Sequence, residues 1–546
     1  MNMLHQFQYD LRLEFAGYNR FRLWQDLLAG ITVAAVALPL ALAFGLSSGA
    51  TAVSGLVTAI ISGLIIGTFS GASFQISGPT GAMSAILITL AAQHGMQGIL
   101  IACFLAGVLL FIAGLFKLGR MIHFIPSSVI TGFTSGIAVV IALGQIDNFF
   151  RVTSHGGLAI EKLASYFTHG FAPHLPSACI GGLVVLIMLF WPKTWNEKLP
   201  SSLAALIFVV ILNEILCWDL VLVASIPQSL LLDERLHLSA FTHIPLRNMI
   251  MPAISIAALA MIESLLCGAA AGKMKHEKLH ADRELLAQGF GNMLLPFFGG
   301  IPATAAIART SVGIKAGGQT RLTGIIHALV LMLSMFILAP LMSKIPLSAL
   351  AGVLMVTAWR MNDWQNIRFI IRHRYKSGIA KLGITLMATV MLDLTQAIII
   401  GVLFSSFLLV ARLREIEINI SEVDDERLKR IGIQLPLVSR QVKVAYLTGP
   451  IFFTVVEKLL RQLSDLKDTS VLILSMRGVS DIDLSGIQAF NELYSILREH
   501  EVELMLSSVQ PKVLKALKRG DILELIGENN IFSSAQHAII AAHGNV

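Results

Sequence analysis

One carboxylate in this chain occupies a position where a charge is costly. Glu263 falls inside the apolar run at 249–271, and a charged side chain in a membrane segment is by default an ion or proton site. Its candidate partners are Ser264, Cys267, Gly300 and Thr304. The alternative interpretation is a structural glutamate, hydrogen-bonded at a helix end near the cytoplasm.

One arginine offers a fixed positive charge. Arg309 lies two turns into the short apolar run at 303–315, where a guanidinium would favour an anion. The alternative is an arginine that extends out of a short helix to reach the cytoplasmic surface.

Two breaks in the apolar pattern have the same composition. Ser77–Met83 reads SGPTGAM and Gly299–Ala306 reads GGIPATAA, each with Gly, Pro and Thr before a short apolar run. A helix that begins inside a membrane presents its unpaired N–H groups and positive dipole end to whatever lies there. Because such breaks occur in both halves of the chain, they predict an anion site near the middle of the bilayer.

A proline lies in the middle of the first apolar run, at 27–46. Pro39 removes a backbone hydrogen bond and kinks a helix. The kink either serves packing or opens room beside the anion site, in which case Phe44 would line that site.

The composition indicates a membrane protein with a soluble end. Of 546 residues, 55% are hydrophobic and 14% are charged, against about 25% charged in a soluble domain. We expect an N-terminal cytoplasmic segment at 1–24, a transmembrane domain at 25–414, a linker at 415–432 and a soluble domain at 433–546.

Several classes of function are disfavoured. The chain has no P-loop, HExxH or GxSxG motif, which argues against an ATP-driven pump or an enzyme, and no cofactor or metal is expected. Its four cysteines lack CxxC spacing and are expected to be buried free thiols. The net charge of +7 does not indicate nucleic-acid binding, because the basic residues cluster in loops between apolar segments, as on the cytoplasmic side of membrane proteins.

Fourteen apolar segments define the predicted topology. They lie near 27–46, 53–70, 79–92, 97–116, 124–146, 178–192, 201–217, 249–271, 285–298, 303–315, 322–343, 346–359, 378–392 and 394–412. The third and tenth are too short to span a bilayer and are predicted to be half-helices. Their positions predict two inverted halves of seven segments each, with both termini in the cytoplasm and the protein in the cell (inner) membrane. Asp393 lies at a segment end, where an interfacial role is favoured.

The soluble segment alternates predicted strands and helices, which indicates a small α/β domain. Its sequence DIDLSG at 481–486 precedes a helix. Asp483 or Ser485 is expected to cap that helix, and the alternative is that Ser485 is a phosphoacceptor.

The chain resembles the SulP (sulfate permease) family of anion transporters over nearly its full length. The motifs that carry the resemblance are SGPTGAM (77–83), IESLLCG (262–268), ELLAQGFGN (284–292), FGGIPATAAIARTS (298–311) and GGQT (317–320). The segment VSDIDLSGI (479–487) resembles the STAS domain attached to these transporters.

The resemblance implies a polytopic helical fold in which a core domain moves against a gate domain, with a cytoplasmic STAS domain and homodimers. It also implies a substrate anion between the starts of the third and tenth helices. The matching substrate residues are Thr80, Gly81, Ala305, Ala306 and Arg309. Glu263 matches a position that is aspartate in sodium-coupled relatives, where threonine stands in place of Cys267. A thiol is a poor sodium ligand, so proton coupling is favoured.

The expected function is therefore a secondary transporter of sulfate, bicarbonate or a C4-dicarboxylate, working by proton symport and alternating access. IESLLC is similar to a dicarboxylate-transporting branch, whereas GGQT is similar to the bicarbonate branch. The alternatives are a sodium-coupled bicarbonate symporter, an anion channel, or a sensor that signals to a cytoplasmic partner through the STAS domain.

Overall fold

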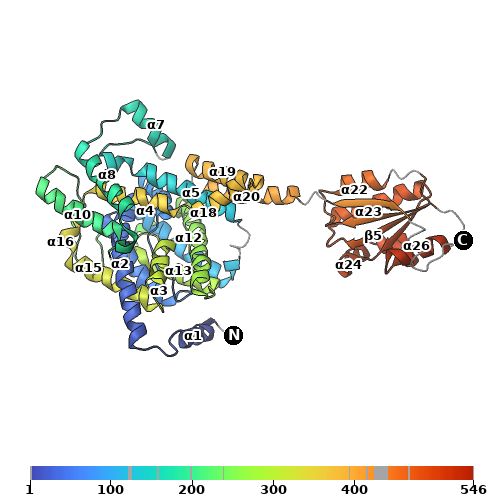
Figure 1. The fold of residues 1–546 in the computed structure, drawn as a ribbon, viewed down its shortest axis with the longest axis horizontal. Coiled ribbons are helices and arrows are strands. Elements are labelled where there is room, and N and C mark those ends of the chain that lie inside the picture. Colours follow the sequence, from blue (N-terminus) through green and yellow to red (C-terminus); the bar gives the residue numbers. More distant parts are fainter. Residues whose placement is uncertain are drawn as a thin grey trace. The chain divides into compact units, whose positions relative to one another are not determined.

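The computed structural model describes residues 3–120, 126–156, 159–196, 199–237, 239–392, 394–412, 416–423, 441–464 and 468–544. The chain forms two compact units, Met1–Leu403 and Phe404–Val546 (Figure 1). The predicted role of Asp393 lies outside the described residues.

Each of the fourteen predicted segments contains a helix, which confirms the expected fold class. The first seven correspond to α2 (Arg20–Ser47), α3 (Ala52–Phe69), α4 (Gly81–Leu115), α5 (Ser127–Gly144), α8 (Leu175–Phe190) and α10 (Ser201–Leu216), with α4 counting twice. The chain turns sharply inside α4 at Gly95, whose φ of 63° and ψ of −167° are not helical. This turn divides α4 into the two segments that the sequence predicted separately, a half-helix and a full span.

The second seven correspond to α12 (Leu246–Lys275), α13 (Ala281–Leu294), α14 (Ile307–Lys315), α15 (Leu322–Ile337), α17 (Leu347–Met361), α19 (Lys376–Met391) and α20 (Leu394–Arg412). The chain segments at 20–47, 52–69, 81–115, 127–150 and 246–275 are long and apolar enough to cross a membrane. The remaining apolar helices are shorter.

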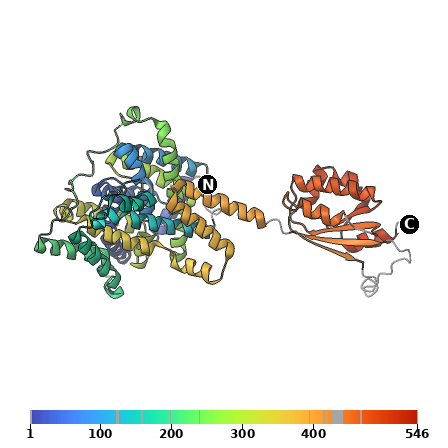
Figure 2. The same cartoon turned by 90° about the horizontal axis from the view of Figure 1, so that it is seen from above.

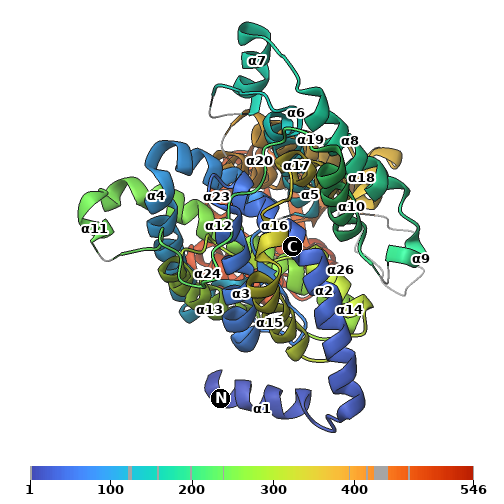
Figure 3. The same ribbon diagram turned by 90° about the vertical axis from the view of Figure 1, so that its left-hand side faces the viewer.

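The helices of the membrane unit pack in two groups (Figure 3). We call α2, α3, α4, α12, α13, α14 and α15 the core group, and α5, α8, α10, α17 and α19 the gate group. The most extensive core contact joins α4 and α13, where a Cβ on Gly107 would lie 2.8 Å from the carbonyl oxygen of Gly289. Small residues permit this close backbone approach, which is how helices associate where no hydrophobic effect acts between them.

The two sequence breaks meet inside the core group. Strand β1 (Ser77–Gly78) pairs antiparallel with β2 (Thr304–Ala305), with Ser77 opposite Ala305 and Gly78 opposite Thr304. Helix α4 begins three residues after this short ladder and α14 begins two residues after it. Residues more than 200 positions apart in the sequence therefore set the starts of both short helices beside each other.

The N-terminal segment is attached to the core group. Helix α1 (Met3–Glu14) ends at Glu14, which accepts hydrogen bonds from the backbone N–H and the guanidinium of Arg321 at 2.7–2.9 Å. The buried carboxylate of Asp26, near the start of α2, accepts from the backbone and hydroxyl of Thr320 and from the hydroxyl of Thr323. These contacts fix the start of α2 to the loop before α15.

The C-terminal unit is an α/β domain with a five-stranded sheet in the order β3-β4-β5-β6-β7. The strands are β3 (Glu417–Glu422), β4 (Val442–Thr448), β5 (Val471–Gly478), β6 (Glu503–Ser507) and β7 (Ile531–Phe532). Helices α22 (Val456–Leu463), α23 (Leu484–Glu499), α24 (Pro511–Arg519) and α25 (Ile522–Ile526) cover one face (Figure 2), and α26 (Ala535–Gly544) covers the other.

The predicted linker requires a correction. Residues 417–422 fall within the range predicted as linker at 415–432, yet they form the antiparallel edge strand β3. Ile416 is buried in the core of this unit, and Ile418 and Ile420 pack against it. The folded domain therefore includes residues before 433.

Candidate anion-binding site

One oxygen of Glu263 joins the starts of both short helices. The hydroxyls of Thr80 and Thr304 donate to Glu263 Oε2 at 2.8 and 2.9 Å. Thr80 immediately precedes α4 and Thr304 lies in β2, two residues before the cap of α14. Glu263 itself is half-buried in the middle of α12, so the predicted alternative of a glutamate at a helix end is wrong.

The two helix starts are capped differently. Thr80 is the N-cap of α4, and its Oγ1 accepts a long hydrogen bond of 3.4 Å from the N–H of Met83. Helix α14 begins after Ala306 without a side-chain cap, and the residues that follow, Ile307 and Ala308, are exposed. An uncapped first turn presents N–H groups to an acceptor, which is the arrangement that binds anions.

The N-terminus of α4 faces two apolar side chains. A Cβ on Gly81 would lie 2.4 Å from Ile141 Cδ1 and 3.0 Å from Phe44 Cε1. Phe44 comes from α2, five residues after Pro39, and Ile141 comes from α5 of the gate group. The structure therefore brings Phe44 to the predicted site and adds Ile141, which sequence reasoning missed because it is one of many apolar residues in α5.

Arg309 lies behind the helix starts. Its side chain is 1% exposed, and Nη2 donates to the carbonyl of Pro79 at 2.9 Å. The other terminal nitrogen, Nη1, packs where a Cβ on Gly78 would lie, and it has no hydrogen-bond partner among the described residues. The alternative of an arginine reaching the surface is wrong. Arg309 supplies positive charge beneath the chain that enters α4.

The remaining predicted residues lie nearby in different roles. The N–H of Ala305 donates to Ser264 Oγ at 3.2 Å, and the N–H of Ala306 donates to the carbonyl of Ile76 at 2.9 Å. The Cys267 thiol donates to Thr310 Oγ1 at 3.4 Å. Ala305 and Cys267 therefore hold the scaffold of the site together.

Gly300 is placed elsewhere. Its N–H donates to the carbonyl of Leu295, and its Cα faces Thr58 from α3. The hydroxyl of Thr58 in turn accepts from the N–H of Ile301 at 2.8 Å. Gly300 thus shapes the turn before β2, and Thr304 is the residue of this stretch that contacts Glu263.

Polar side chains of α13 support β1 and the chain before it. Gln288 of α13 donates to Ser77 Oγ and to Glu284 Oε1, both at 2.9 Å, and Glu284 accepts from Ser70 and the N–H of Gly71. Glu284 and Gln288 belong to the ELLAQGFGN motif, so the sequence contained a signal for these two residues. Across the described residues, no group of three or more His, Cys, Asp or Glu side chains could hold a metal ion.

In the C-terminal domain, Asp483 is the cap of α23. Its Oδ1 accepts from the N–H of Gly486 at 2.8 Å, and Oδ2 accepts from the N–H of Phe453 at 2.9 Å. Ser485 occupies the first turn and is half-buried. In the same loop, the hydrogen bond from Lys512 holds the pKa of Asp481 below its ordinary value.

Comparisons with known proteins identify both units. The pattern of the sulfate permease family matches residues 23–390, and that of the STAS domain matches residues 433–538. The Bacillus subtilis protein named "Putative sulfate transporter YvdB" is 32% identical over 534 residues, covering 95% of this chain and 97% of that protein. The bicarbonate transporter BicA of Picosynechococcus is 27% identical over 543 residues, covering 94% of each.

Solved structures agree on the fold. The transmembrane domain of a cyanobacterium bicarbonate transporter, BicA, has a TM-score of 0.63 at 29% identity and covers 70% of this chain and 97% of that one. Murine Slc26a9, an anion transporter solved in an inward-facing state, has a TM-score of 0.84 at 18% identity and covers 98% of this chain and 94% of that one. The chain belongs to the sulfate permease family and carries a C-terminal STAS domain.

Proposed function

We propose that this protein is a secondary transporter, not an enzyme, that moves a small anion together with a proton. The observation that carries the proposal is the shared contact of Thr80 and Thr304 with a single oxygen of Glu263. This contact joins a titratable carboxylate directly to the two helix starts where an anion would bind.

Charge provides the coupling in this proposal. An ionised Glu263 beside the helix starts repels an incoming anion, and protonation removes that repulsion. Protonation also frees a donor. The Thr80 hydroxyl has one proton, which Glu263 Oε2 accepts in the structure. When Glu263 is protonated and donates its own hydrogen, the Thr80 hydroxyl can turn toward the anion instead.

The contacts support a proton more than sodium as the coupled ion. Sodium would need several oxygen ligands facing an open centre. Here the hydroxyls of Thr80 and Thr304 both donate directly to the carboxylate. One helical turn further along α12 lies Cys267, whose thiol donates to Thr310. We infer that a proton on Glu263, rather than a bound sodium ion, is the coupled ion.

The anion is an oxyanion in this proposal. The relatives are named for sulfate and for bicarbonate, and backbone N–H groups recognise charge more than shape. C4-dicarboxylates remain in the test set. We further propose a homodimer in the cell membrane with both termini in the cytoplasm, and a STAS domain that regulates transport or binds a cytoplasmic partner.

The test uses proteoliposomes and three anions: sulfate, bicarbonate and succinate. Each is offered with an inward proton gradient, with an inward sodium gradient, and with neither. We expect accumulation of at least one anion with the proton gradient alone. Accumulation that requires sodium would contradict proton coupling, and large currents without any coupling would identify a channel.

Glu263→Gln then tests the residue. We expect this variant to lose proton-driven accumulation while it still exchanges labelled anion across the membrane. Glu277→Gln is the matched control, because it removes a carboxylate in the loop after α12 that accepts from Ser73 and does not contact the helix starts. Proton-driven accumulation that persists in Glu263→Gln would refute the proposed role.

A further inference from the structure

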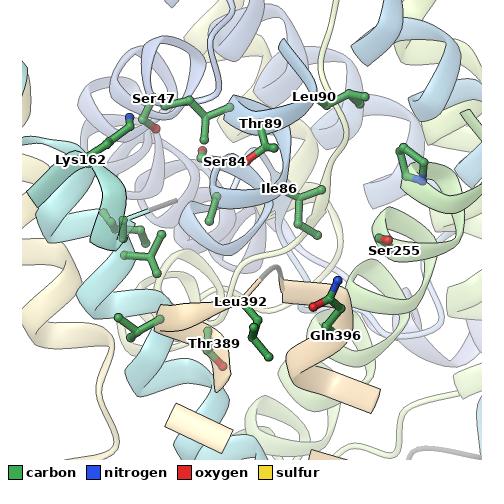
Figure 4. Close-up of a pocket in the computed structure, with 18 of the residues that line it drawn as sticks. Ser47, Ser84, Ile86, Thr89, Leu90, Lys162, Ser255, Thr389, Leu392 and Gln396 are labelled. Atoms are coloured by element: carbon green, nitrogen blue, oxygen red, sulfur yellow. The ribbon is translucent and has the colours of Figure 1, made fainter. Parts of the chain in front are cut away.

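A pocket lies between the core group and the gate group, beside the proposed site (Figure 4). It has a volume of about 360 Å³. One wall comes from the core helices α2, α4 and α12, through residues such as Ser84, Thr89 and Ser255. The other wall comes from α5, α7 (Ala159–His169), α19 and α20, through residues such as Lys162 and Gln396.

The side chains that line the pocket suit an anion. They are mixed polar and apolar, and Lys162 is the ionisable residue among the described residues that line it. In Figure 4 its side chain extends toward the end of the pocket where Ser47 lies. A single positive charge in such a partly apolar cleft raises the local concentration of anions.

The carboxylates of the same segment are directed elsewhere. Asp147 accepts hydrogen bonds from Tyr166 at 2.8 Å and from Ser154 at 2.6 Å. Glu161 packs over Gly156, because a Cβ added to Gly156 would lie 2.5 Å from the Cβ of Glu161. Neither belongs to the pocket lining. Among the described residues of this wall, Lys162 is therefore the one that presents a charge to the pocket.

The pocket ends next to the start of α4. Ser84, in its lining, lies one helical turn after Thr80 and donates to the Thr80 carbonyl at 3.1 Å. Ile141, also in its lining, is the side chain that packs against Gly81. Ile141 therefore lies between the pocket and the first turn of α4, and Phe44 packs against the same glycine.

We propose that this pocket is an access vestibule for the transported anion, that Lys162 selects for negative charge in it, and that Ile141 with Phe44 closes it from the α4 N-terminus. The proposal rests on anion transport as the function. Helix α7 packs on α5 and α19 of the gate group, whereas Ser84 and Thr89 belong to the core group. Movement of one group against the other therefore changes the distance between Lys162 and the anion site.

The first experiment measures how easily charged reagents reach the pocket, and it does not depend on transport. Thr89→Cys is introduced after the exposed Cys179 and Cys217 are replaced by serine, and the buried Cys103 and Cys267 are kept. Modification rates are measured with an anionic and a cationic methanethiosulfonate of similar size. We expect the ratio of anionic to cationic rates to fall about threefold with Lys162→Gln and about tenfold with Lys162→Glu, and to be retained with Lys162→Arg. High salt should reduce these differences, since it screens the charge.

The second experiment measures uptake by the same Lys162 variants, with Thr89 intact. Lys162→Glu should raise KM for the anion about tenfold with kcat within about twofold of wild type, and Lys162→Arg should match wild type. An unchanged rate ratio at Thr89→Cys overturns the vestibule proposal, whether or not the protein transports any tested anion. A charge-dependent ratio in a protein that transports none of them would instead contradict the proposed function and leave an anion-attracting pocket.

Discussion

The hydroxyl of Thr80 bonds to Glu263 and to the start of α4 at the same time. It donates to Glu263 Oε2 at 2.8 Å, and its oxygen accepts from the N–H of Met83 at 3.4 Å. A carboxylate on α12 is therefore connected to the N-terminal turn of the half-helix through one side chain. A change in the protonation of Glu263 acts directly on this hydroxyl, as it does on the hydroxyl of Thr304.

Thr80→Val tests whether the Thr80 hydroxyl, rather than the size of the side chain, makes this connection. Valine has nearly the same shape but no hydroxyl, so the variant loses an N-cap, worth about 1 kcal/mol, and a hydrogen bond to a carboxylate, worth about 1.5–3 kcal/mol. We expect a lower melting temperature and weaker proton-driven accumulation, measured by thermal unfolding in detergent and by uptake. Thr80→Ser, which keeps the hydroxyl, should restore both. Equal behaviour of the serine and valine variants would show that the hydroxyl has no role.

The sequence predicted the breaks at 77–83 and 299–306 because Gly, Pro and Thr in an apolar context leave few other interpretations. It did not predict that Ser77 pairs with Ala305, because the partner of a two-residue strand is set by tertiary packing. Ile141 was missed for a related reason. Its importance comes from its contact with Gly81 across two helix groups, and nothing in the composition of α5 distinguishes it from its neighbours.

Gly81→Ala tests the closure over the anion site. The added Cβ would lie 2.4 Å from Ile141 Cδ1, which is the end of a flexible side chain. We therefore expect modest destabilisation, about 1 kcal/mol, but a large loss of uptake, because the methyl and the displaced isoleucine fill the space before the helix start. Ile141→Ala in the same chain should recover part of the uptake.

Gly383→Ala is the matched control, since a Cβ there meets no atom within 4 Å. If Gly81→Ala transports as well as this control, or if Ile141→Ala has an independent and additive effect, then Ile141 does not close over Gly81.

Asp26 should be more sensitive to truncation than to loss of charge. Its Oδ1 accepts from the N–H groups of Gln319 and Thr320 and from the Thr323 hydroxyl, while Oδ2 accepts from the hydroxyls of Tyr18 and Thr320. Asparagine keeps one acceptor, and its NH₂ can donate to the two hydroxyls at Oδ2 if they reverse. We expect a loss of about 1 kcal/mol for Asp26→Asn and roughly 3 kcal/mol or more for Asp26→Ala, which leaves buried donors unpaired. Thermal unfolding of the full chain checks this order, and equal losses would contradict it.

The edge strand β3 determines where a stable fragment of the STAS domain must begin. The C-terminal unit has its own hydrophobic core, so fragments of it can be compared directly. A fragment at 433–546 lacks Ile416, Ile418 and Ile420, whereas a fragment at 416–546 keeps them. Each isoleucine contributes about 1–2 kcal/mol by burial, and removal of β3 also leaves β4 as an unpaired edge. We expect the shorter fragment to unfold at lower urea concentration and to aggregate. Ile418→Ala in the longer fragment should lie between the two, and equal midpoints for both fragments would show that β3 adds nothing to the domain.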